Sequence, residues 1–175
     1  MTTYSQIRDT LKSGDLVFTS HSKWNSFYNL QVMLVRLASL SEFSHVGVVV
    51  EIGSRKFLAE SVAPLVRLIP LSNYADEGFY VSPTNVPMTD GELEFLMSKV
   101  GVGGYSKWQA VKAWFNKLNI GEDEWFECAE LVIHARRMSG AKLGNRAVPA
   151  SIAKEVLQQG LNMYYVKNEE VKLGV

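Results

Sequence analysis

The chain has 175 residues, of which 47% are hydrophobic and 21% charged, the ordinary composition of one soluble globular domain. Its 18 basic and 18 acidic side chains give a formal net charge of zero, so no overall field attracts it to nucleic acid or anionic lipid. A lone cysteine excludes an internal disulfide, and no apolar run reaches the roughly 18 residues that span a bilayer. Because residues 1–16 lack the apolar core of a signal peptide, we expect a cytoplasmic protein.

The first half of the sequence predicts an antiparallel sheet, preceded by a short helix over residues 2–12. The apolar run at 46–50 is typical of a strand buried on both faces. Gly53-Ser54 is a turn signal that would fold the next strand back along it. The expected strands are 16–18, 46–50, 57–61, 66–69 and 79–82.

Residues 25–40 predict a helix with an unusually wide apolar face, which includes Phe27, Leu30, Leu34 and Leu37. The simpler interpretation is a core helix that is covered on most sides. The alternative is a helical lid inserted over the site, or a groove for an acyl chain. In that case this segment would contact lipid or a membrane surface.

The second half is predicted to be mainly helical, with a last strand at 164–166. Thr89 and Glu92 have the spacing of a capping box, in which each side chain bonds the other's backbone N–H at a helix start. The expected helices cover 89–100, 106–115, 128–138 and 150–159, with Pro149 in the first turn of the last. The predicted fold class is therefore α+β, an antiparallel sheet with packed helices.

Cys128 stands near the start of its expected helix, where unpaired N–H groups and the helix dipole favour a thiolate. It shares one helix face with Leu131, Val132 and Ala135, so it faces the body of the protein. From these residues alone, a small buried hydrophobe is the simpler interpretation. A nucleophile would also need a base within reach.

Three histidines are candidates for that base. His134 lies six residues beyond Cys128, about 240° around the same helix, and so points away from it. His21 lies in a polar stretch that predicts a surface loop. His45 stands at the head of the apolar strand, where it would be held rigidly near an open end. From this position alone, a hydrogen-bonded structural histidine is the better interpretation.

A carboxylate partner for His45 follows from the expected hairpin register. A turn symmetric about Gly53-Ser54 places Gly47 opposite Glu60, which makes Glu60 a diagonal neighbour of His45 on the same face. Gly47 would leave room for the carboxylate to reach the ring. A carboxylate there would fix the tautomer of the histidine. An odd-numbered loop would separate the two groups, and Glu60 would then be a surface charge.

Short motifs in this order resemble the circularly permuted NlpC-like papain-fold hydrolases, the YiiX/YaeF-like group. They lie at 14–18, 44–50, 58–61, 89–106, 127–132 and 148–150, so that the resemblance covers residues 14–159. It implies a permuted papain-like fold with the chain order histidine, polar residue, cysteine. It also implies that His45 is the base, Glu60 the orienting acid and Cys128 the nucleophile. Tyr105 would match a tyrosine that contacts substrate.

This resemblance implies one catalytic domain over residues 1–175, a cysteine amidase or peptidase that works without metal or cofactor. Cys128 would attack an amide or ester carbonyl and form a thioester acyl-enzyme. A small molecule, a cell-wall peptide or an acyl lipid would serve as substrate. A bacteriophage origin would bring a cytoplasmic enzyme to the cell wall at lysis. Two alternatives stay open: an acyltransferase or lipid-modifying enzyme, and a non-catalytic binding module that keeps the fold.

Overall fold

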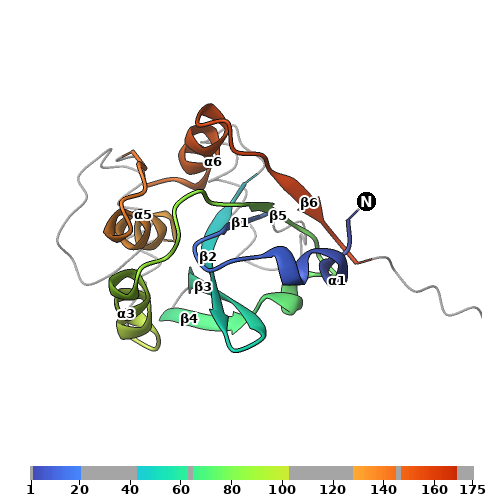
Figure 1. Cartoon of the computed structure of the whole chain (residues 1–175), viewed down its shortest axis with the longest axis horizontal. Coiled ribbons are helices and arrows are strands. Elements are labelled where there is room, and N and C mark those ends of the chain that lie inside the picture. The colour runs from blue at the N-terminus through green and yellow to red at the C-terminus, as the bar shows by residue number, and fades with distance from the viewer. Residues whose placement is uncertain (1, 21–42, 63–64, 103–127, 145–146, 169–175) are drawn as a thin grey trace, which may run out of the picture.

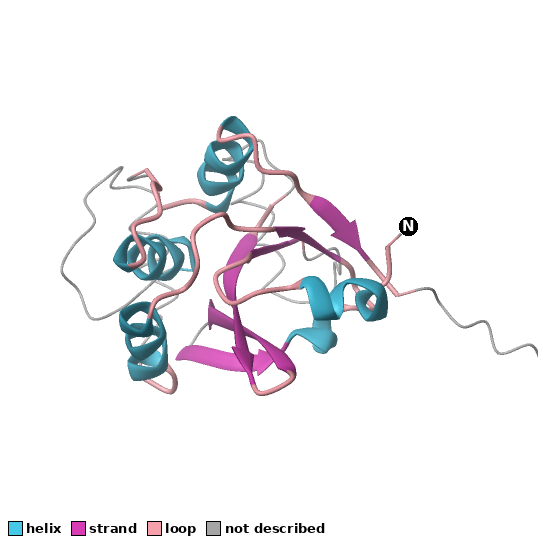
Figure 2. Ribbon diagram, viewed as in Figure 1, coloured by secondary structure: helices cyan, strands magenta, loops and turns pink. Residues whose placement is uncertain are grey.

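A computed structural model of the chain describes residues 2–20, 43–62, 65–102, 128–144 and 147–168. Within them the fold is α+β, a six-stranded antiparallel sheet with four α-helices (Figures 1 and 2), as the sequence predicts. The predictions for residues 25–40 and 106–115, for His21 and for Tyr105 lie outside the described residues.

All of the predicted strands are present, and each lies next to a strand that runs in the opposite direction. The sheet has the order β4-β3-β2-β1-β5-β6. The strands are β1 (Leu16–Thr19), β2 (His45–Ile52), β3 (Arg55–Val62), β4 (Leu65–Pro70), β5 (Phe79–Ser82) and β6 (Tyr164–Val166). Strand β2 is buried from His45 to Val50 because it has a strand on each edge and a packed layer on each face.

The two faces of the sheet are covered by different parts of the chain. On one face lie α3 (Asp90–Lys99), α5 (Cys128–Met138) and α6 (Pro149–Gln158), which pack on a cluster that includes Val46, Val48 and Val50. On the other lie α1 (Tyr4–Ile7), the 3₁₀ turn η1 (Arg8–Thr10) and the 3₁₀ turn η2 (Leu71–Tyr74). Figure 1 shows α3 and α5 beside one another, away from α1.

The hairpin of β2 and β3 has the predicted register. Ile52 pairs with Arg55 across the two-residue turn at Gly53 and Ser54, and the pairing continues to Val48 opposite Ala59. Gly53 has a φ of +62°, a conformation that suits glycine in such a turn. Because the loop has an even number of residues, the side chains keep the faces that the sequence assigns them.

Two local predictions need correction. The first helix is shorter than 2–12, since α1 ends at Ile7 and continues only as η1. The capping box at Thr89 is half formed: Thr89 Oγ1 accepts from the backbone N–H of Glu92 at 3.3 Å, but the Glu92 side chain turns inward. There its Oε2 accepts from Arg136 Nη1 at 2.7 Å. A buried guanidinium without a carboxylate partner would destabilise the fold more than an incomplete capping box does.

Candidate active site

His45 and Glu60 form a buried pair in the hairpin of β2 and β3. His45 begins β2 and Glu60 lies near the end of β3, and their Nε2 and Oε2 atoms are 2.6 Å apart. Their exposed fractions are 7% and 0%. The hairpin register thus brings together the two residues that the sequence analysis pairs.

Gly47 lies close to the neighbouring strand β3. A Cβ atom at this position would lie 2.8 Å from Leu58 Cδ1 and 2.9 Å from the Ala59 carbonyl oxygen. The space that a Cβ atom of residue 47 would need is therefore taken by the neighbouring strand and its leucine. Glycine here permits close packing of β2 on β3.

Two further residues, both missed by the sequence analysis, hold the Glu60 carboxylate. Arg67 Nε donates to Oε1 at 2.7 Å, and the Tyr74 hydroxyl lies 2.9 Å from Oε1 and 2.8 Å from Oε2. Burial opposes the charge of this carboxylate, but bonding and charge from His45 and bonds from Tyr74 and Arg67 outweigh it and lower its pKa.

Arg67 could have been found from the sequence, whereas Tyr74 could not. The strands β3 and β4 are joined so that Val62 pairs with Leu65, and this register places Arg67 directly opposite Glu60. An arginine and a glutamate at such positions form a favourable cross-strand pair. Tyr74 arrives from η2, whose position depends on tertiary packing.

Cys128 is the first residue of α5, as predicted, and is half-buried against the helical face of the sheet. Its sulfur interacts with His45. Burial of His45 disfavours the charged ring, but charge interaction and hydrogen bonding with Cys128, together with those of Glu60, raise the pKa of His45 to about 10. Since Nε2 faces Glu60, Nδ1 is the ring nitrogen left for the sulfur.

Thr19, the last residue of β1, lies directly opposite His45 in the sheet. The residue is 3% exposed, and its Oγ1 is buried without any hydrogen-bond partner in the described structure. A buried hydroxyl without a partner costs free energy, because it gives up the hydrogen bonds that it makes to water in the unfolded chain. It is therefore an unusual feature beside the imidazole.

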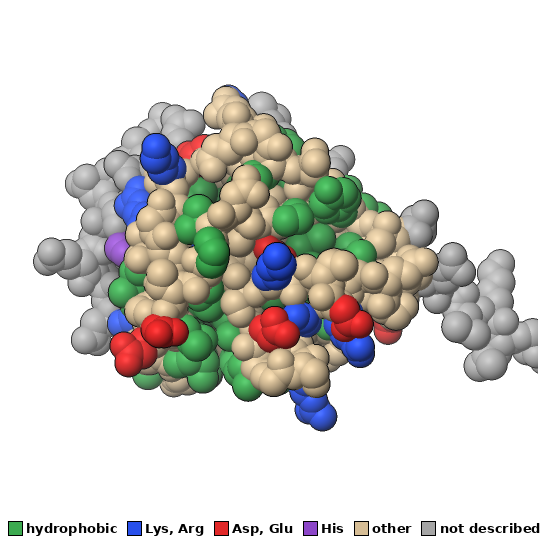
Figure 3. Space-filling view, in the orientation of Figure 1, with side chains coloured by type: hydrophobic (Ala, Val, Ile, Leu, Met, Phe, Trp, Pro, Cys, Tyr) green, Lys and Arg blue, Asp and Glu red, His purple; other side chains and the backbone are tan. Residues whose placement is uncertain are grey.

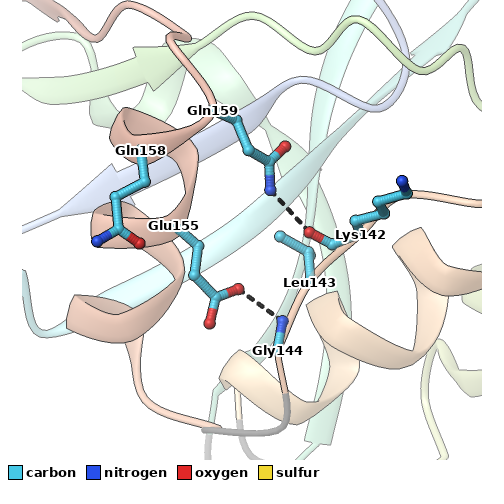
Figure 4. Close-up of a pocket in the computed structure, with 6 residues that line it drawn as sticks. All are labelled: Lys142, Leu143, Gly144, Glu155, Gln158 and Gln159. Carbon is cyan, nitrogen blue, oxygen red and sulfur yellow. Dashed lines mark hydrogen bonds between the residues drawn. The ribbon is translucent and has the colours of Figure 1, made fainter.

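The surface pocket in Figure 4 is not part of this arrangement. It lies between α6 and residues 142–144, and its lining contains none of the three site residues. Its polar groups bond one another: Gly144 N donates to Glu155 at 2.6 Å, and Gln159 donates to the Lys142 carbonyl at 2.7 Å. These groups are therefore already satisfied.

Charge on the face of the molecule shown in Figure 3 gives no second candidate. On the face shown in Figure 3, acidic and basic side chains of the described residues lie interspersed, so no broad patch of one sign forms there. No helix in the described ranges combines the length and hydropathy that crossing a bilayer requires.

Comparison with known proteins supports the fold and leaves the chemistry open. No protein-family model and no curated protein matches the sequence. Among solved structures, the chain is similar to the metalloprotein YiiX (DUF1105) of Escherichia coli O157:H7, with a TM-score of 0.53 and 20% identity. The match covers 76% of this chain and 69% of that one. It is a likeness of fold, and YiiX belongs to the group that the sequence motifs resemble.

Proposed function

We propose that the chain is a cysteine-dependent hydrolase that cleaves an amide or ester bond through a thioester acyl-enzyme. The observation that carries the proposal is a buried imidazole that bonds a carboxylate at 2.6 Å through Nε2. The raised pKa of this imidazole, to which the Cys128 thiol on another element contributes, supports it. Thiol-based acyl transfer requires a nucleophile, a base that accepts its proton and an acid that orients the base.

In the proposed reaction the Cys128 thiolate attacks the carbonyl carbon, and the negative charge that moves to the oxygen is stabilised by the N–H groups at the start of α5. The His45 imidazolium then gives its proton to the leaving amine or alcohol as the bond to carbon breaks. Neutral His45 next takes a proton from water, the hydroxide attacks the thioester, and the acid product and thiolate are released. Glu60 keeps the ring oriented and supports its positive charge throughout.

The chain order His45, Glu60, Cys128 supports the further proposal of a permuted papain-like fold. In this arrangement the sheet that carries the base precedes the helix that carries the nucleophile. The fold likeness to YiiX supports the same assignment. A cell-wall peptide or an acyl lipid is the substrate class that we propose on the basis of the motif resemblance.

YiiX is described as a metalloprotein, but the described residues of this chain do not offer a metal site. Within the described ranges, no three or more His, Cys, Asp or Glu side chains converge as ligands. Nε2 of His45 is also committed to Glu60. The side chains of the described residues therefore do not fit a metal ion, and the proposed reaction uses none.

Alkylation of the thiol tests the proposal. We expect iodoacetamide to label Cys128 of the folded protein rapidly near neutral pH and His45→Gln to slow the labelling at least about tenfold, because an imidazolium favours the thiolate. His134→Gln, which alters another histidine, is the matched control and should label like the parent chain. Hydrolysis of a p-nitrophenyl ester, with a covalent acyl adduct detected by mass, should be lost in Cys128→Ser.

Other outcomes point to the alternatives. A thiol that reacts only after unfolding would overturn the proposal and leave a binding module. An acyl adduct that is released far faster by an added amine or alcohol than by water would identify an acyltransferase.

A further inference from the structure

We propose that Arg67 and Tyr74 are positioning residues that hold the Glu60 carboxylate in one orientation and in its charged form behind His45. This inference deepens the proposed function and rests on it. It adds two residues to the site. They would act through Glu60.

The first argument is geometric. Glu60 has no exposed surface, and its oxygens are surrounded by donors from three different elements. Oε2 lies 2.6 Å from His45 Nε2 and 2.8 Å from the Tyr74 hydroxyl, while Oε1 lies 2.7 Å from Arg67 Nε and 2.9 Å from the same hydroxyl. Both oxygens are therefore fixed, and the carboxylate cannot rotate without breaking at least one bond.

The second argument concerns the proton. A charged carboxylate only accepts hydrogen bonds, and each contact on Glu60 can supply a donor. A proton on Oε1 would point at the Arg67 guanidinium, which has no acceptor, so one bond would be lost. The arrangement therefore fits the ionised form of Glu60 and disfavours the neutral form.

The third argument is the balance of charge around Glu60. Among the described residues, the groups that face it are His45 from β2, Arg67 from β4 and Tyr74 from η2, and the α5 thiol acts on His45. Without Arg67, the positive charge beside this buried carboxylate within the described ranges would be that of His45, and His45 must also serve the sulfur. The tyrosine adds a donor without adding charge. The two residues thus stabilise the same ionised state in different ways.

A purely structural role is the competing explanation, because an arginine and a glutamate opposite one another can simply join β3 to β4. The chain contains such a pair for comparison: Glu92 and Arg136 are both fully buried, bonded at 2.7 Å, and join α3 to α5. The hydrogen bonds of Arg136 in the described structure go to Glu92, Thr84 and Val86, and none goes to His45 or Cys128. A variant of Arg67 would lose stability under either role. A shift in the pH profile of Cys128 alkylation would be expected only if Arg67 has the positioning role.

The test is the pH dependence of Cys128 alkylation, measured together with ester hydrolysis in the full chain. The acid limb of this profile belongs to the coupled Cys128, His45 and Glu60 groups as a unit. We expect Arg67→Met to move its midpoint up by about one pH unit, a tenfold loss of rate on that limb, because an opposite charge beside a carboxylate shifts its titration by about that much. Tyr74→Phe should move it in the same direction by roughly half a unit, since it removes bonds but no charge.

Two further variants complete the test. Arg67→Lys should recover most of the shift because it keeps the charge. Arg8→Met is the matched control, since it removes an exposed arginine paired with Asp9, and its profile should coincide with that of the parent chain. If Arg67→Met proves too unstable to measure, Tyr74→Phe and Arg67→Lys decide the question.

The result that overturns the inference is an acid limb that stays unchanged in Arg67→Met and Tyr74→Phe while only the melting temperature falls. That outcome would leave a reactive thiol and the proposed function intact. Failure of the proposed function looks different, because the thiol of the parent chain would then be unreactive at every pH at which the protein is folded.

Discussion

The buried hydroxyl of Thr19 allows a prediction whose sign is unusual. Most substitutions in a core destabilise a protein, but Thr19→Val should stabilise this one. The residue is 3% exposed, and its Oγ1 has no hydrogen-bond partner in the described structure. Valine has nearly the same shape and replaces only the hydroxyl by a methyl group. The substitution should therefore remove a desolvation penalty of about 1 to 3 kcal/mol without opening a cavity.

Urea denaturation and calorimetry measure this effect. For a chain of this size, each kcal/mol gained should raise the melting temperature by about 2 to 4 °C. Thr84→Val is the matched control, because Thr84 Oγ1 accepts from Arg136 Nη2 at 2.9 Å and from Val86 N at 3.1 Å. The same substitution there should destabilise the protein by about 1 to 3 kcal/mol, since it leaves those donors unpaired. A Thr19→Val variant that is less stable than the parent chain would refute the reasoning, because it would show that the hydroxyl does have a partner.

Two further predictions concern the carboxylate and the imidazole. Glu60→Gln should lower the pKa of His45 and slow Cys128 alkylation at least about tenfold near neutral pH, since one pKa unit is a factor of ten. The control is Glu94→Gln, on the exposed side of α3, which should label like the parent chain. A labelling rate that Glu60→Gln leaves unchanged would contradict the role assigned to Glu60. The pKa of His45 is raised from 6.5 to about 10 in the folded protein, so the stability it contributes is complete below pH 6.5 and is lost as the pH rises toward 10. The difference in unfolding free energy between the parent chain and His45→Gln should shrink over that range, and a difference that grows with pH would disprove the raised pKa.

The sheet was predictable because strands and a two-residue turn are encoded locally. The apolar run of β2 and the turn at Gly53 and Ser54 fix the hairpin register, and the register alone brings His45 and Glu60 onto one face. The interaction of Cys128 with His45 was not encoded in this way, because it depends on how α5 docks on the sheet. The pairing of Cys128 with His45 was expected from the motif resemblance and not from a local sequence pattern.

The features that sequence reasoning missed are contacts between distant parts of the chain. The Thr89 and Glu92 spacing satisfies a local rule, yet Glu92 bonds Arg136, 44 residues away, since a buried charge must be compensated. Tyr74 likewise reaches Glu60 from a short turn with no periodic pattern. The helix at 25–40 and the role of Tyr105 remain predictions, as both lie outside the described residues.

The distribution of the site along the chain has a consequence for synthesis. His45, Glu60, Arg67 and Tyr74 all belong to the continuous run from β2 to η2, whereas Cys128 follows more than fifty residues later. Since proteins are made from the N-terminus, a ribosome completes the acid–base half before it adds the sulfur. The nascent thiol would then meet its imidazole only when α5 docks on the sheet, so that reactivity would arise last, as the packing of the chain is completed.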